Sequence, residues 1–122
     1  ILDYGVEGKE GEAQFDQGCE EFIRVINYAA SQPNIPYISI KVTGFARFTL
    51  LEQLDEAMHA QPQLALVPRY HTALEGLTPT EKDEWSRVVV RMQKICAAAA
   101  AKGVGVLVDA EETWIQDPVD AL

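Results

Sequence analysis

Two ionisable residues of opposite charge stand where the sequence otherwise predicts buried β-strands. Lys41 lies inside the apolar run at 37–43, and Asp109 directly follows the apolar run at 104–108. Lysine and aspartate are rarely buried without a partner, because an isolated charge is costly to remove from water. An inward lysine can hold a substrate carboxylate through a charge-assisted hydrogen bond, and an aspartate can balance its charge. The pair therefore indicates either an active site or a structural ion pair.

Alternation along each predicted strand separates a bulky apolar face from a face of small and ionisable residues. In the run at 37–43 the second face carries Ser39, Lys41 and Thr43. The later run and the N-terminal run divide in the same way, and their small and ionisable residues are Gly105, Leu107, Asp109 and Glu111, and Asp3, Gly5 and Glu7. A layer of helices suits the apolar faces, and the interior of a barrel suits the others.

Helices are predicted between these strands. Apolar residues recur at helical spacing over 12–31, and the helix is expected to stop before Pro33. Thr49 and Glu52 have the spacing of a capping box at the start of a short helix. Residues 61–77 contain two prolines and are expected to be irregular or weakly helical.

A long helix precedes the last strand. Thr78 and Glu81 form a second potential capping box, and Pro79 occupies the first helical position, where its missing donor does no harm. The helix is expected to end at Lys102 and Gly103, since glycine readily adopts the left-handed conformation that terminates helices.

This order of elements predicts the fold class. Strands that alternate with helices form parallel sheets, so the class is α/β. Ionisable residues at the strand ends favour the first three strand–helix units of a (β/α)8 TIM-type barrel, whose active site lies at the carboxyl ends of the strands. Asp3 and Glu7 are expected to brace the barrel mouth or to pair with basic neighbours rather than to do chemistry. Glu111 and Glu112 are adjacent, so only one of them can point inward.

Length and composition limit the function classes. The chain has 122 residues, 48% of them hydrophobic, which suits one modest core. A net charge of −9 argues against binding to nucleic acid and to anionic lipid. No run approaches the ~18 apolar residues of a membrane span. Because the chain lacks an initial methionine and a new apolar period begins near its end, we expect it to be part of a longer protein.

Several other residues receive structural interpretations. Cys19 and Cys96 lie on apolar stripes of separate helices and are expected to be buried, reduced thiols, which suits a reducing compartment. His59 and His71 are expected at the surface. Aromatic side chains, Trp85 and Trp114 among them, are expected in the core.

Three segments resemble the first barrel strands of the proline dehydrogenase family, in order. They are Leu2-Asp3-Tyr4-Gly5-Val6-Glu7-Gly8, Ile38-Ser39-Ile40-Lys41-Val42-Thr43-Gly44 and Val106-Leu107-Val108-Asp109-Ala110-Glu111-Glu112-Thr113-Trp114. The resemblance covers nearly the whole chain and implies that residues 1–122 are a fragment of a single catalytic barrel. That family oxidises L-proline to Δ1-pyrroline-5-carboxylate by transferring a hydride to FAD.

The resemblance also implies roles for three residues. Lys41 matches the lysine that helps to bind the proline carboxylate, and Asp109 matches the aspartate beside the substrate and flavin. Ala110 matches a residue that touches the flavin. The paired arginines of the family's last barrel helix and most of its flavin-binding segments have no counterpart in this sequence, so the 122-residue piece alone is expected to be inactive.

Alternative functions and several partners stay open at this point. Lys41 could form a Schiff base in a barrel aldolase, or the chain could be a non-catalytic barrel fragment with a structural Lys41–Asp109 pair. No metal site is expected. The expected partners are L-proline and an electron acceptor, with a membrane quinone as one candidate. An exposed strand edge predicts self-association. The resemblance suits a cytoplasmic or mitochondrial protein, including one at the periphery of a membrane.

Overall fold

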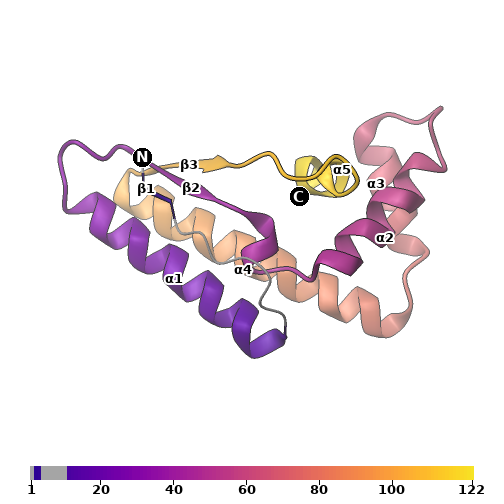
Figure 1. Ribbon diagram of the computed structural model, residues 1–122, viewed down its shortest axis with the longest axis horizontal. Helices are drawn as coiled ribbons and strands as arrows, with labels where there is room; N and C mark the ends of the chain where they lie inside the picture. The colour runs from indigo at the N-terminus through magenta and orange to yellow at the C-terminus, as the bar shows by residue number, and fades with distance from the viewer. Residues whose placement is uncertain (1, 4–10) are drawn as a thin grey trace.

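A computed structural model describes residues 2–3 and 11–122 of the chain (Figure 1). Its elements follow the predicted alternation of strands and helices. In chain order they are β1 (Leu2–Asp3), α1 (Glu12–Ala30), β2 (Tyr37–Ile40), the short 3-10 helix η1 (Val42–Gly44), α2 (Phe48–His59), α3 (Leu66–Glu75), α4 (Pro79–Lys102), β3 (Gly105–Val108) and α5 (Gln116–Ala121).

The three strands form one parallel sheet in the order β1-β2-β3, which confirms the predicted class and strand order. Ile40 pairs with Val108 at the last position of the β2–β3 register. Both strands are shorter than the apolar runs suggested. Lys41 lies one residue beyond β2 in an extended conformation, and the chain then turns into η1. Closure into a barrel requires further strands and stays a prediction.

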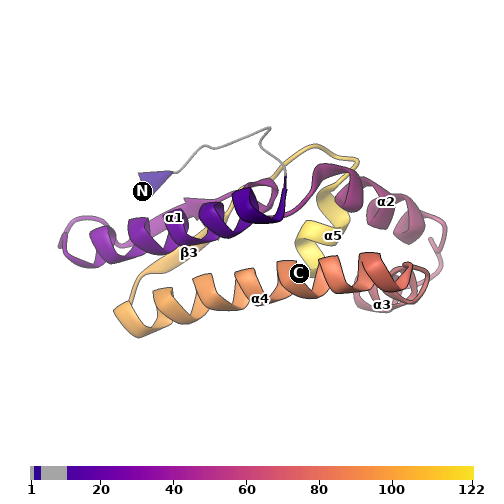
Figure 2. The ribbon, with the colours of Figure 1, turned by 90° about the horizontal axis from the view of Figure 1, so that it is seen from below.

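Two long helices cover the apolar face of the sheet. Figure 1 shows α1 and α4 below β2 and β3, and in Figure 2, which is seen from below, the two helices run side by side while α2, α3 and α5 gather toward the other end of the molecule. The core between sheet and helices includes Ile38, Ile40 and Val42, each fully buried. The alternation of strand β2 therefore assigned its apolar face correctly. Val108, expected on the same kind of face in β3, is instead 42% exposed, so the prediction for this residue was wrong.

A close approach of backbones fixes α1 beside the end of β2. A Cβ atom at Gly18 would lie 2.1 Å from the backbone oxygen of Gly44, a distance that no side chain tolerates. Gly18 therefore lets α1 pack directly against η1. Since η1 follows Lys41 immediately, this contact helps to set where the carboxyl end of β2 stops.

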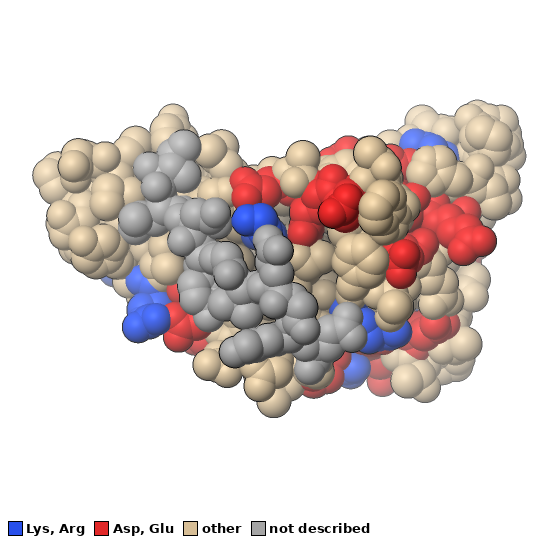
Figure 3. All heavy atoms as spheres, in the orientation of Figure 1, with Lys and Arg blue, Asp and Glu red and all other residues tan. Residues whose placement is uncertain are grey.

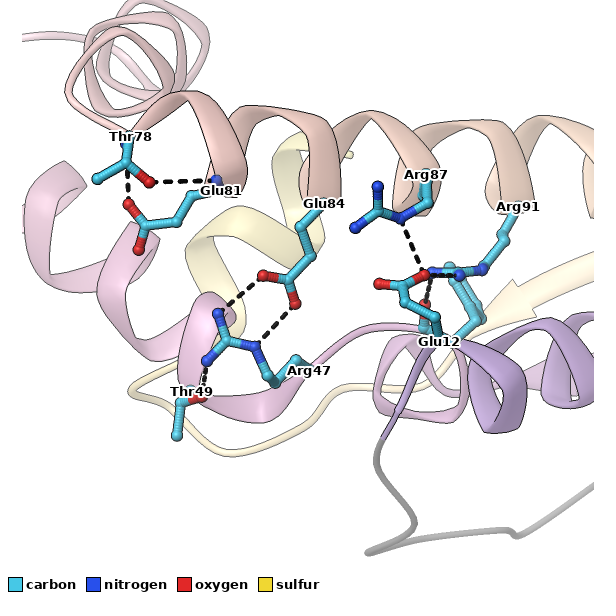
Figure 4. A network of polar contacts seen from close by, with 9 residues as sticks. Glu12, Arg47, Thr49, Thr78, Glu81, Glu84, Arg87 and Arg91 are labelled. Atoms are coloured by element: carbon cyan, nitrogen blue, oxygen red, sulfur yellow. Dashed lines mark hydrogen bonds and ion pairs between the residues drawn. The ribbon is translucent and has the colours of Figure 1, made fainter.

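The predicted ends of the long helix α4 are confirmed. The Thr78 side chain accepts a hydrogen bond from the Glu81 backbone, and the Glu81 carboxylate accepts one from the Thr78 backbone (Figure 4). These bonds satisfy two amides that the helix itself leaves free. At the other end Gly103 adopts the left-handed conformation with φ 67°. The helix predicted over 12–31 is also confirmed, as α1.

The capping box predicted at Thr49 was wrong. Helix α2 begins at Phe48 after Arg47, so Thr49 already lies inside its first turn. Arg47 Nε and Nη2 each donate a 2.8 Å hydrogen bond to the Glu84 carboxylate on α4, and Arg47 Nη1 donates one to the Thr49 hydroxyl (Figure 4). We attribute the earlier helix start to the ion pair between Arg47 and Glu84. The Thr49 hydroxyl accepts a hydrogen bond from Arg47 instead of capping the helix.

Three further expectations need correction. Residues 66–75, expected to be at most weakly helical, form helix α3, and Pro68 is tolerated because it lies in the first turn. Cys96 is exposed rather than buried because the buried stripe of α4 passes through Ile95 instead. Trp114, expected in the core, is 53% exposed on the connection after β3. The expectations for Cys19, Trp85 and the exposed His59 and His71 are confirmed.

A buried arginine joins α1 to α4. The Arg91 side chain is only 4% exposed and donates a hydrogen bond to Glu12 (Figure 4). It also donates to Asp16 at 2.9 Å and to the Phe45 backbone at 3.1 Å. Arg87 adds a 3.0 Å contact with Glu12. Burial alone would raise the pKa of Glu12, but hydrogen bonds from the two arginines prevail and lower it. Arg91 is thus the charged residue on the otherwise apolar buried stripe of α4, and the carboxylates of α1 balance its charge.

Candidate active site

The parallel register brings Lys41 and Asp109 to the same edge of the sheet. Each residue directly follows a strand, and the Asp109 backbone amide donates a 2.9 Å hydrogen bond to the Ile40 carbonyl, which extends the ladder by one step. Lys41 Nζ lies 3.3 Å from Asp109 Oδ2, and the two side chains are 21% and 35% exposed. The two charged residues that the sequence singled out are therefore paired, partly buried and open to a ligand.

Ser39 also contacts Asp109, which the sequence interpretation did not anticipate. The Ser39 hydroxyl donates to Asp109 Oδ1, the carboxylate oxygen that does not face Lys41. This hydrogen bond, followed by the Lys41 interaction, lowers the pKa of Asp109 against the opposing effect of partial burial. Asp109 is consequently a carboxylate throughout the neutral range. The period-2 pattern did place Ser39 beside Lys41, and only the register with β3 shows what it contacts.

A second pair of contacts fixes the connection that follows Asp109. Thr43 Oγ1 donates to Glu111 Oε1 at 2.5 Å, and the Thr43 backbone amide lies 3.3 Å from Glu111 Oε2. The Glu111 amide in turn donates to Gln116 Oε1 at 2.7 Å. Glu112 is exposed, in agreement with the expectation that only one of the adjacent glutamates faces the site. Glu111 thus ties the β3–α5 connection to η1.

Apolar surface adjoins the charged pair. Tyr37 and Leu107, on the same face as Ser39, are 48% and 44% exposed. The Tyr37 ring lies over Gly105, where an added Cβ would be 2.3 Å from the ring. Ala110, the residue after Asp109, is exposed. The face thus offers a charged centre beside flat, uncovered apolar surface.

The electrostatic character of this edge is acidic. Residues 103–122 contain no lysine or arginine, and Figure 3 shows acidic side chains gathered over the β3–α5 connection and α5. Lys41 therefore supplies local positive charge among carboxylates. The expected roles of Asp3 and Glu7 lie outside what the structure describes, since Glu7 and the Asp3 side chain are not among the described parts.

A separate polar cluster joins α2 to α5. Ligand atoms of Asp55, His59 and Asp117 lie within 4.8 Å of one another, a spacing that could hold a metal ion. The protein already partners these groups: His59 lies 2.7 Å from buried Asp55, Asp55 accepts from the Asp117 amide at 3.1 Å, and Arg69 lies 3.3 Å from Asp117. We therefore interpret the cluster as a set of structural contacts that hold α2, α3 and α5 together.

Comparison with known proteins identifies relatives over the whole chain. The family model for proline dehydrogenase matches residues 1–122. The chain is 30% identical over its full length to the carbapenem antibiotics biosynthesis protein CarD of Pectobacterium carotovorum subsp. carotovorum, covering 28% of that protein. It is 29% identical over 98% of its length to mitochondrial proline dehydrogenase 1 of Arabidopsis thaliana, again covering 28%.

The chain also matches mitochondrial proline dehydrogenase 1 of Dictyostelium discoideum at 28% identity, over 95% of the chain and 24% of that protein. It thus spans roughly a quarter of the length of these curated relatives. No solved structure matches it significantly. Among the helices within 11–122, none combines the length and apolar character needed to cross a bilayer.

Proposed function

The chain belongs to the proline dehydrogenase family, and we propose that it forms part of a (β/α)8 catalytic barrel that oxidises L-proline to Δ1-pyrroline-5-carboxylate. The observation that carries the proposal is the meeting of Lys41 and Asp109 at the carboxyl ends of neighbouring parallel strands. In barrels of this class, side chains at the strand ends contact the substrate. Residues 1–122 would supply the first three strand–helix units, and further strands would complete the site.

Lys41 is proposed to bind the substrate carboxylate. Its ammonium group already lies 3.3 Å from one carboxylate and is partly exposed, so an incoming anion can reach it. A charge-assisted hydrogen bond of this type contributes about 1.5–3 kcal/mol. Because residues 103–122 contain no lysine or arginine, Lys41 brings positive charge to this edge and favours an acid over a neutral ring.

Asp109 is proposed to balance the charge of Lys41 in the empty site and to order the substrate once it is bound. Its lowered pKa, caused by the Ser39 hydrogen bond and by Lys41, keeps it ionised. An ionised carboxylate beside the bound amino acid can accept a hydrogen bond from the ring nitrogen. The position of the Asp109 carboxylate would therefore affect the orientation of the reacting carbon of the substrate as well as the affinity for the substrate.

The exposed surface fits a flavin as a neighbour. A flavin bound beside this edge would accept the hydride, which is chemistry that side chains cannot supply. Ala110 projects only a methyl group and, with exposed Leu107, offers apolar surface on which a flat ring can pack. Ala110 is accordingly proposed to contact FAD. The proposal includes a cytoplasmic or mitochondrial location and an external electron acceptor such as a membrane quinone.

The geometry gives less support to a Schiff-base aldolase. Such a lysine must present a neutral amine to the substrate carbonyl. The carboxylate of Asp109, ionised and 3.3 Å from Lys41 Nζ, works against that neutral form.

A substitution of Lys41 tests the function in the complete protein. Lys41→Ala should raise the KM for L-proline by roughly 10-fold to 150-fold with little change in kcat, because a contact common to the ground and transition states is lost. Inhibition by pyrrolidine, the same ring without a carboxylate, should not change. Lys94→Ala removes an exposed lysine of α4 and serves as the matched control. An unchanged KM for proline in Lys41→Ala would contradict the assignment.

A further inference from the structure

Ser39 is a small polar residue in a nearly closed environment. It is 7% exposed in the middle strand β2, opposite Leu107 in the register. Its hydroxyl donates to Asp109 Oδ1, whereas Lys41 Nζ approaches Oδ2. The two oxygens of one carboxylate thus contact Ser39 in β2 and Lys41 directly after it.

These two contacts differ in what happens when substrate arrives. A substrate carboxylate that binds Lys41 would compete with Asp109 for the ammonium charge and would weaken the Lys41–Asp109 contact without abolishing it, since the ammonium group has three N–H donors. The Ser39 hydroxyl is buried and does not compete in this way. The backbone of Asp109 is also fixed, through its 2.9 Å hydrogen bond to Ile40. Ser39 is thus the contact that can continue to orient the side chain.

We propose that Ser39 is a positioning residue that holds the Asp109 carboxylate in one orientation while Lys41 is engaged by the substrate. The catalytic consequence rests on the proposed proline oxidation, whereas the positioning itself depends only on the observed hydrogen bond. Ser39 does not touch the substrate in this account. It acts through Asp109, so its removal should affect kcat rather than KM, the opposite of the effect of removing Lys41.

The size of the effect follows from the geometry. A carboxylate freed at Oδ1 can rotate away from the reacting carbon, and misplacement by ~1 Å costs up to about 100-fold in rate. Ser39→Ala should therefore lower kcat roughly 10-fold or more and leave the KM for proline within about 2-fold. It should also move the acid limb of the kcat profile to higher pH, because the carboxylate loses a hydrogen bond that favours its ionised form.

The experiment compares four variants with the wild type in the complete protein. Ser39→Ala and Ser39→Cys remove or weaken the donor, Ser39→Thr keeps a hydroxyl, and Ser86→Ala is the control at an exposed serine of α4. Proline kinetics are measured across pH, and the titration of the Asp109 carboxyl is followed by carbon-13 NMR. We expect Ser39→Ala and Ser39→Cys to lower kcat and raise the Asp109 titration midpoint, and Ser39→Thr to restore both.

Two results would overturn the inference. One is an Asp109 titration that does not change in Ser39→Ala, and the other is a loss of kcat that Ser39→Thr fails to rescue while its melting temperature stays normal. The NMR measurement separates this inference from the proposed function. A wild type that does not oxidise proline, with an Asp109 titration that still depends on the Ser39 hydroxyl, refutes the function and supports the positioning.

Discussion

A double-mutant cycle on Lys41 and Asp109 separates a functional pair from a structural one. The two side chains are 21% and 35% exposed, so their 3.3 Å contact is intermediate between a surface and a buried ion pair. Pairs near the surface contribute about 0.2–1 kcal/mol, whereas breaking a fully buried pair costs about 3–5 kcal/mol. We therefore expect Lys41→Ala to lower the free energy of unfolding by about 1 kcal/mol or less, since Ser39 still partners the remaining carboxylate.

Asp109→Ala should cost more than Lys41→Ala. It removes the same contact and also leaves the buried Ser39 hydroxyl without this acceptor, which adds about 1–3 kcal/mol. The coupling energy between the two sites should be about 0.5–1 kcal/mol. Because the folded pKa of Asp109 is lowered, its stabilising contribution is present above the unfolded value and is lost as pH falls through the folded value.

Urea unfolding of the wild type, Lys41→Ala, Asp109→Ala and the double variant measures the two single losses of stability and the coupling energy. Repeating it at acidic pH measures the loss of the Asp109 contribution, and Lys94→Ala is the control at an exposed lysine. Equal losses of about 3–5 kcal/mol in both single variants, with stability regained in an apolar double replacement, would make the pair structural. That result would refute the assignment of these residues to a substrate site.

Three further predictions concern the fold. Arg91→Ala should lower the free energy of unfolding by about 1–3 kcal/mol, measured in urea, because the Phe45 carbonyl loses its donor, whereas Glu12 and Asp16 are exposed enough to be hydrated instead. A loss below about 0.5 kcal/mol would show that the network contributes little. Thr78→Ala should cost about 1 kcal/mol through loss of the α4 cap, and thermal unfolding beside an exposed Thr72→Ala control checks this. The isolated chain should associate as concentration rises, because Leu107 and neighbouring apolar side chains of β3 are exposed; a strictly monomeric chain in analytical ultracentrifugation would contradict that.

The sequence predicted most of what depends on local pattern. The strand order, the parallel class, helices α1 and α4, and the cap at Thr78 all follow from periodicity and turn chemistry. The features that it missed depend on contacts between distant segments. The start of α2 is set by Arg47 and Glu84, which are far apart in the chain, so the local signal at Thr49 was misleading.

For the site, residue type and position were enough to select Lys41 and Asp109, because charges at the ends of apolar strands are exceptional. The contact of Ser39 with Asp109 could not be predicted, since it depends on the exact β2–β3 register. A shift of the register by one residue would turn the partner side chains to the opposite face. The functional roles of Lys41, Asp109 and Ala110 stay predictions.

Anaerobic reduction of bound flavin by L-proline tests the central claim most directly. The complete protein that contains this chain should be isolated with FAD, and L-proline should reduce the flavin with formation of one equivalent of Δ1-pyrroline-5-carboxylate. In Lys41→Ala the reduction should need a much higher proline concentration, and in Asp109→Ala it should be slower at saturation. A folded complete protein that binds no flavin, or whose flavin stays oxidised in excess L-proline, would contradict the account.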